Sequence, residues 1–215
     1  MDWKKESTKG IPLLLRLPNL ALKSSWRPYR PRPGERVVII RSRRTFPPGH
    51  PTTRLCLELL GGLSLSGRRL LDVGCGTGIL ALAGAALGAE PCVGVDLSRA
   101  AVKLSKESAR ENRLDHKVLL AQGSTECLRG PFQVVVANLP AAVQLAKVEE
   151  FSRLAADDAI LILSGFRDSQ EPPLKELYDK AGWSIRRRLT KDEFCIELPP
   201  EKSFTWVAWL LEGRK

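Results

Sequence analysis

The sequence has little of what a metal site or a disulfide framework requires. Its 215 residues include two histidines, His50 and His116, and five scattered cysteines that form no CxxC pair. A zinc site would have to gather its ligands from distant segments, and an odd number of cysteines cannot pair completely. We therefore expect no metal site, and we expect the cysteines to be reduced and mostly buried.

Long apolar runs are also missing. No stretch approaches the roughly 20 apolar residues that cross a bilayer. The first six residues include two lysines, and they lack the uninterrupted apolar stretch of a secretory signal. Hydrophobic residues make up 43% of the chain and charged residues 27%, which is usual for a globular domain. We expect a cytoplasmic protein that does not contact membranes.

Positive charge is concentrated near the N-terminus. The chain carries a formal net charge of +10, and residues 1–45 contain twelve Lys or Arg against three acidic residues. Pro28, Pro31 and Pro33 lie in the same segment and prevent a long helix there. We therefore predict a basic Pro/Arg-rich arm over 1–45 and one domain over 46–215. Such an arm is a candidate for contact with the phosphate backbone of a nucleic acid or with an acidic protein.

Apolar strands alternate with helical segments along most of the chain. We expect strands at 36–40, 69–73, 92–95, 118–121, 132–137, 159–163, 183–189 and 204–211, and helices near 52–60, 79–87, 98–112, 143–154 and 173–181. Near-continuous apolar strands that alternate with helices indicate a buried parallel sheet with helices on both faces. The last two strands are joined by a short polar link, which suits an antiparallel pair. The predicted fold class is α/β, with a Rossmann-like, mostly parallel seven-stranded sheet and an antiparallel closing strand.

A glycine-rich loop follows the strand at 69–73. Asp72 stands at the carboxyl end of that strand, and the GxGxG spacing differs from the GxGxxG that accommodates a pyrophosphate. Glycines allow a positive φ and a close approach to a ligand, and the helix that follows offers free N–H groups. A carboxylate at Asp72 would repel a pyrophosphate but favour the ammonium of a methionine moiety. The loop therefore predicts S-adenosylmethionine over a dehydrogenase dinucleotide, and its binding residues are Asp72, Gly74, Cys75, Gly76, Thr77 and Gly78.

Two further polar residues end predicted strands. Asp96, with Leu97 after it, is placed to bind ribose hydroxyls; the alternative is a capping or surface role. Asn138 precedes Leu139 and Pro140. Its side-chain oxygen and the Leu139 carbonyl can accept hydrogen bonds from a target N–H and aim the nitrogen lone pair at the methyl group. The alternative for Asn138 is a turn before a proline.

Four other residues have less specific signals. Ser124 either borders the adenine or forms a plain turn. His50 either positions a substrate or packs the entrance loop. Trp206 and Trp209 are three residues apart on a predicted strand, so they should point to opposite faces of the sheet. We assign both tryptophans to core or edge packing.

Four segments of the sequence resemble motifs of known methyltransferases. Residues 70–81, which include the glycine loop, resemble the first motif of class I methyltransferases. Three more segments resemble PrmA, a bacterial family of methyltransferases that act on protein eleven of the large ribosomal subunit. These segments are 50–60, similar to the HPTT helix of the family; 134–139, similar to its VVVANIL motif; and 163–166, similar to its LSGIL segment. The resemblance covers about residues 46–215.

The resemblance implies the class I methyltransferase fold, S-adenosylmethionine as cofactor and a ribosomal protein as substrate. It also implies that Thr52 and Thr53 reach the methionine end of the cofactor, although either could also cap the helix that follows. Two features depart from the family: residues 46–50 are shorter by one than the corresponding motif, and Ser98 stands where a second acid is usual. PrmA proteins carry a substrate-recognition domain before the core, and we expect the 45-residue arm to be too short for it.

The leading hypothesis is an N-methyltransferase that acts on a protein. The run Asn138-Leu139-Pro140 lies between the NIL of PrmA and the NPP[YF] of amide- and base-amino methyltransferases, both of which methylate nitrogen. An alternative is an RNA or DNA methyltransferase whose arm contacts phosphates, but residues 141–143 contain no aromatic side chain to stack on a flipped base. A second alternative is a non-catalytic cofactor-binding scaffold. The acceptor atom and the oligomeric state are not predicted.

Overall fold

The computed structural model describes residues 13–41, 47–193 and 203–213, and its larger sheet has seven strands in the order β6-β5-β4-β7-β8-β10-β9. Neighbouring strands from β6 to β8 are parallel, whereas β10 is antiparallel to both β8 and β9. The predicted sheet is therefore confirmed. Its strands are β4 (Leu70–Val73), β5 (Cys92–Asp96), β6 (Val118–Gln122), β7 (Phe132–Asn138), β8 (Ala155–Arg167), β9 (Trp183–Asp192) and β10 (Thr205–Gly213).

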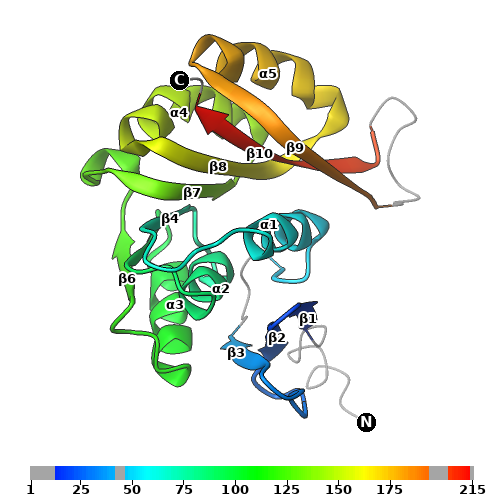
Figure 1. Cartoon of the computed structure of the whole chain (residues 1–215), viewed down its shortest axis with the longest axis vertical. Helices are drawn as coiled ribbons and strands as arrows, with labels where there is room; N and C mark the ends of the chain where they lie inside the picture. Colours follow the sequence, from blue (N-terminus) through cyan, green and yellow to red (C-terminus); the bar gives the residue numbers. More distant parts are fainter. Residues whose placement is uncertain (1–12, 42–46, 194–202, 214–215) are drawn as a thin grey trace.

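Helices cover both faces of this sheet, as predicted (Figure 1). One face carries α1 (Pro51–Gly61), α2 (Ile79–Ala86) and α3 (Arg99–Glu111), and the other carries α4 (Ala141–Leu154) and α5 (Glu171–Lys180). Ser98 caps α3 by accepting a hydrogen bond from the Ala101 N–H at 3.3 Å, as its position in the sequence predicts. No helix in the described part of the chain is long and apolar enough to span a membrane.

The start of α1 differs from the prediction. The N-cap is His50, whose Nδ1 accepts a hydrogen bond from the backbone N–H of Thr52. Pro51 occupies the first helical position, where its missing N–H costs nothing. The prediction of Thr52 or Thr53 as the cap is therefore wrong. Both threonines lie in the first turn of the helix, and their side chains are buried.

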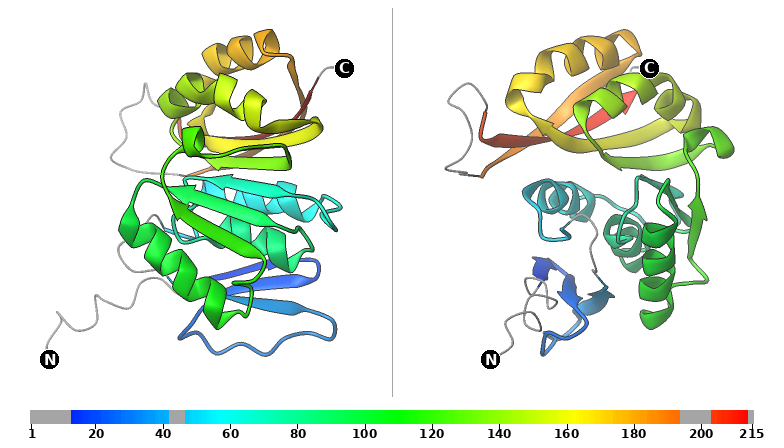
Figure 2. Two further views of the ribbon diagram at one scale, coloured as in Figure 1. Left: turned by 90° about the vertical axis from the view of Figure 1, so that its left-hand side faces the viewer. Right: turned by 180° about the vertical axis from the view of Figure 1, so that it is seen from behind.

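A second, smaller sheet precedes the larger one. It consists of β1 (Leu14–Leu17), β2 (Leu20–Ser24) and β3 (Arg36–Ile40), with β2 antiparallel to β1 and parallel to β3. Only β3 was predicted. The small sheet packs outside the layer of α1, α2 and α3, on the side away from the larger sheet (Figures 1 and 2). The segment predicted as an arm thus contains a packed sheet; the domain boundary at residue 45 stays a prediction.

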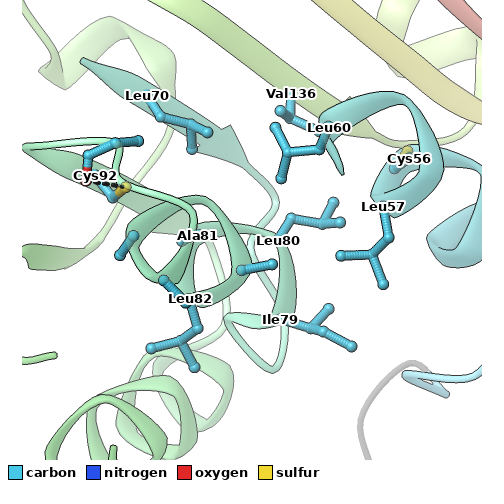
Figure 3. Packing of buried hydrophobic residues seen from close by; sticks show 14 of the residues in the cluster. Cys56, Leu57, Leu60, Leu70, Ile79, Leu80, Ala81, Leu82, Cys92 and Val136 are labelled. Carbon is cyan, nitrogen blue, oxygen red and sulfur yellow. Dashed lines mark hydrogen bonds between the residues drawn. The ribbon is translucent and has the colours of Figure 1, made fainter. Parts of the chain in front are cut away.

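Apolar side chains fill both faces of the larger sheet. On one face, Leu60 of α1 lies near Val136 of β7, and Leu57 of α1 and Leu80 of α2 belong to the same cluster (Figure 3). On the other face, Phe151 and Trp209 are fully buried. The four described cysteines are free: Cys56, Cys75 and Cys92 are buried as expected, and Cys127 is exposed. Cys195 lies outside the described residues.

Candidate functional site

A cavity of about 890 Å³ lies at the carboxyl ends of the central parallel strands. This is where ligands bind in open α/β sheets. Among the predicted site residues, Gly78 and Ser124 do not line the cavity. The structure brings all the others together there, along with His50: Thr52, Thr53, Asp72, Gly74, Cys75, Gly76, Thr77, Asp96, Leu97, Asn138 and Leu139.

The three glycines of the loop all have a positive φ, as their spacing suggested: +70° at Gly74, +54° at Gly76 and +77° at Gly78. A Cβ on Gly74 would lie 2.5 Å from Cδ2 of Leu139, so this glycine lets the Leu139 side chain cross the loop. A Cβ on Gly78 would lie 3.0 Å from Cβ of Ser105 on α3. Gly78 therefore serves the packing of α2 against α3, which explains why it does not reach the cavity.

Asp72 lies at the floor of the cavity and is only 1% exposed. Its Oδ2 accepts a hydrogen bond from the Ala81 N–H, in the first turn of α2, at 3.0 Å. Burial and, to a smaller extent, the nearby Asp96 charge raise the pKa of this carboxyl to about 7, against the opposing effect of the Ala81 hydrogen bond. A cation placed against Asp72 would favour the ionised form.

Asp96 holds the glycine loop against the end of β5. Its Oδ2 accepts a hydrogen bond from Gly76 N–H and its Oδ1 one from Ser98 N–H, each at 2.8 Å. The cap of α3 is Ser98 and not Asp96, so the capping alternative is not observed. A carboxylate accepts about four hydrogen bonds, so the half-buried group keeps acceptor capacity on the cavity side. Leu97, next to it, is 75% exposed and offers an apolar surface at the rim.

Asn138 ends β7 with its side chain held by α1. Its Nδ2 donates a hydrogen bond to Oγ1 of Thr53 at 3.3 Å. Its Oδ1 is buried and has no hydrogen-bond partner among the described residues. A buried acceptor without a partner is costly. Since Asn138 lines the cavity, the arrangement suits a ligand that brings a hydrogen-bond donor to this oxygen.

The loop after Asn138 is held from two sides. The Leu139 carbonyl accepts a 2.6 Å hydrogen bond from Nε2 of Gln144, which also donates to the Ser164 carbonyl at 2.6 Å. The Leu139 N–H donates to the same Ser164 carbonyl at 2.9 Å. The prediction gave the Leu139 carbonyl to a target N–H, but Gln144 already engages it. Asn138 is therefore the better-placed acceptor. Sequence reasoning missed Gln144, because a glutamine in the first turn of a helix carries no distinctive pattern.

Trp206 forms part of the cavity wall near His50. The two rings pack edge to face with centroids 4.9 Å apart, and the Arg167 guanidinium lies 3.7 Å from the centroid of the Trp206 ring. Burial lowers the pKa of His50, and the Arg167 charge lowers it further against the opposing effect of Glu193. Trp209 is buried on the other face of the sheet, as predicted. For Trp206, however, packing is only part of its role, because it also lines the cavity.

Comparison with known proteins shows the family of the chain. The family model described as ribosomal protein L11 methyltransferase (PrmA) matches residues 1–198. The chain belongs to the PrmA family. The match to the PrmA family includes β1, β2 and β3, so it begins earlier than the resemblance at 46–215 indicated.

Individual PrmA-family relatives differ in how much of their length the chain covers. A ribosomal protein L11 methyltransferase of Thermotoga petrophila is 37% identical over 145 residues, which are 67% of this chain but 54% of the relative. The corresponding protein of Deinococcus radiodurans is 32% identical over 190 residues, 85% of this chain and 69% of the relative. The chain thus spans about half the length of the Thermotoga relative.

A solved structure supports the fold assignment of this PrmA-family chain. The ribosomal protein L11 methylase of Lactobacillus delbrueckii subsp. bulgaricus has a TM-score of 0.80 and 21% identity, and the match covers 94% of this chain and 98% of that one. The predicted Rossmann-like class I methyltransferase fold is therefore confirmed.

Proposed function

We propose that this PrmA-family chain is an S-adenosylmethionine-dependent N-methyltransferase of a protein, and that the protein is ribosomal protein L11. The observation that carries the proposal is the arrangement of the cavity. Two carboxylates, Asp72 and Asp96, line the same cavity as Asn138, whose buried Oδ1 has no hydrogen-bond partner among the described residues. The relatives named for this activity support the choice of substrate. The proposed location is the cytoplasm.

The residues present fit S-adenosylmethionine. Its ammonium group would meet Asp72, its ribose hydroxyls would meet Asp96, and its adenine would lie against Leu97. A pyrophosphate would instead bring negative charge to a floor where Asp72 and Asp96 already repel each other. When bound, the cofactor supplies a methyl carbon on a sulfonium whose leaving thioether is neutral.

The acceptor nitrogen would be oriented by Asn138. In-line displacement requires the nitrogen lone pair to face the methyl carbon at about 3 Å. A hydrogen bond from the target N–H to Asn138 Oδ1 fixes one direction at the nitrogen and leaves the lone pair free. A lysine amine is mostly protonated at neutral pH; a partly dry cavity lowers its pKa and favours the neutral form. The proton leaves for solvent before transfer.

The test of the acceptor uses purified ribosomal protein L11 and protein-free ribosomal RNA in separate reactions with radiolabelled S-adenosylmethionine. We expect label in the protein alone, on nitrogen, as located by mass spectrometry of proteolytic peptides. Label in the RNA would instead support the nucleic-acid methyltransferase. If the chain binds the cofactor tightly in calorimetry but transfers no methyl to either, the scaffold alternative is supported.

Asn138→Ala tests the site itself. Loss of the orienting acceptor should lower kcat about 10²-fold, the scale expected when a reacting group is misplaced by about 1 Å. Cofactor affinity should change little. Thr53→Val is the companion variant: it removes the partner that holds the Asn138 amide, at a residue that also lines the cavity, and it should lower kcat by less. An unchanged kcat in Asn138→Ala would show that Asn138 does not orient the acceptor.

A further inference from the structure

The outer face of α3 carries a stripe of cations. Arg99, Lys103, Lys106 and Arg110 are all exposed, and they recur at intervals of four, three and four residues. At 3.6 residues per turn, the four side chains fall within about 60° of arc, along about 16 Å of helix. The opposite side of α3 is buried against the sheet. In Figure 2 (left), α3 lies at the front of the molecule with no other element over it.

These four cations have no ion-pair partner among the described residues, unlike the arginines of β9. The three consecutive arginines of β9 each pair with a separate carboxylate, as Arg186–Glu212, Arg187–Glu58 and Arg188–Glu171. No carboxylate among the described residues lies within ion-pair distance of the α3 stripe. Of the two glutamates on α3, Glu111 pairs with Arg41 and Glu107 faces the cavity. The stripe is therefore positive charge that the fold itself does not neutralise.

The surroundings of the stripe distinguish between two kinds of anionic partner. Stable protein interfaces rely on buried aromatic or aliphatic anchors. In the described part of the chain the exposed large apolar side chains are Trp26, Leu97, Leu119 and Val143, and none of them lies on the outer face of α3. Contacts from Lys and Arg to phosphates need no such anchor. A row of cations without an apolar side chain among them thus favours a nucleic-acid backbone over an acidic protein.

The stripe also adjoins the cavity. Lys103 belongs to both, because it is exposed on α3 and lines the cavity together with Leu97 and Leu104. A strand held along α3 would therefore run beside the cavity mouth without entering it. This placement differs from that of a methyl acceptor, which has to reach Asn138.

We propose that the α3 stripe docks the phosphate backbone of RNA beside the methyl-transfer cavity. The choice of RNA rests on the proposed function, since a ribosomal protein substrate is surrounded by RNA. The docking itself does not depend on methyl transfer. The proposal adds RNA to the protein substrate as a partner. It assigns phosphate contact to a helix of the core in addition to the N-terminal segment.

Fluorescence anisotropy of a labelled 20-nucleotide single-stranded RNA tests this proposal, with the full chain and no cofactor present. The variant is Arg99→Gln/Lys106→Gln/Arg110→Gln; it leaves out Lys103, which lines the cavity. The matched control is Lys175→Gln/Lys180→Gln/Lys191→Gln, which removes the same charge from exposed positions elsewhere. We expect the α3 variant to bind about tenfold more weakly at 0.1 M salt. Its slope of log K against log salt should be shallower by about two, at roughly 0.7 per lost phosphate contact.

Equal slopes in the α3 variant and the control would overturn the proposal, and so would a wild-type chain that does not bind RNA. The same measurement is repeated with DNA of the same sequence and with a polyglutamate of equal charge. Binding of polyglutamate as tight as that of RNA would show that the partner is an acidic protein. DNA bound more tightly than RNA would contradict the choice of RNA. L11 methylation without RNA is measured separately, so a failure of docking and a failure of the proposed function remain distinguishable.

Discussion

At the residue scale, Asp72 couples the stability of the fold to pH. Its pKa is about 7 in the folded chain against an ordinary value of 3.8, because burial disfavours the charge. The folded state therefore binds the proton more strongly than the unfolded state. This contribution to stability is complete below about pH 4 and is lost as pH rises through 7. The shift of about three pKa units bounds it at about 4 kcal/mol.

Asp72→Asn should remove this dependence, because the amide does not titrate. Urea unfolding at pH values from 4.5 to 8 should show wild type losing stability relative to the variant as pH rises; a constant difference would contradict the raised pKa. The cofactor should respond in the opposite sense. An ammonium against Asp72 stabilises the carboxylate, so the affinity of wild type for S-adenosylmethionine should increase from pH 5 to pH 7, and that of the variant should not.

Site residues could be predicted where they stand at the end of a recognisable strand. Asp72, Asp96 and Asn138 each end an apolar run that the sequence identifies as a buried parallel strand, and all three line one cavity. Gln144 and Trp206 were not predicted as site residues. Their positions depend on contacts across the sheet, with the carbonyls of Leu139 and Ser164 for Gln144 and with the His50 ring for Trp206.

At the element scale, the approach of β8 to the loop after β7 depends on Gly165. Its φ is +98°, and a Cβ there would lie 2.7 Å from the Leu139 carbonyl carbon. Gly165→Ala should therefore cost about 2–5 kcal/mol, from left-handed strain plus overpacking, and should lower methyl transfer by displacing the loop that carries Asn138. Chemical denaturation and kcat are the two measurements.

Gly182→Ala is the matched control for this change. Gly182 has a similar φ of +85°, but a Cβ there would meet nothing within 4 Å, so only the strain of about 1–2 kcal/mol applies. Methyl transfer by this variant should be unchanged. If both variants lost the same stability and Gly165→Ala kept full activity, the close contact with Leu139 would have no functional consequence.

Elements with strong local patterns were predicted well, and those that depend on distant partners were not. The strands of the larger sheet are apolar runs long enough to be recognised, and α3 has a clear cap at Ser98. By contrast, β1 and β2 have four and five residues in a segment whose prolines and cations favoured an arm. Their burial comes from α1 and α2, which follow much later in the sequence.

At the scale of the whole molecule, the N-terminal segment is joined to the helices by specific contacts. Asn112, at the end of α3, accepts a hydrogen bond from Ile39 N–H and donates one to Ile39 C=O, both at 2.7 Å. Arg41 pairs with Glu111, and Arg36 donates to the Ala86 carbonyl. Two of the basic residues predicted to face a partner are thus engaged within the fold.

These contacts imply that the small and large sheets unfold as one cooperative unit. Leu22 of β2 is fully buried in the same apolar cluster as Leu57 and Leu80, so Leu22→Ala should cost about 2–5 kcal/mol. Hydrogen exchange measured by mass spectrometry should then show an equal loss of protection in peptides of β2 and of β4, because the most protected amides exchange through global unfolding. Leu119→Ala, at a side chain that is 55% exposed, should change neither.

Loss of protection confined to residues 13–41 in Leu22→Ala would mean that the segment is an independent arm after all. Deletion of the segment would then be a fair test of its role in binding; if the two sheets are coupled, only substitution of exposed cations can test that role, because deletion would expose the apolar cluster on α1 and α2.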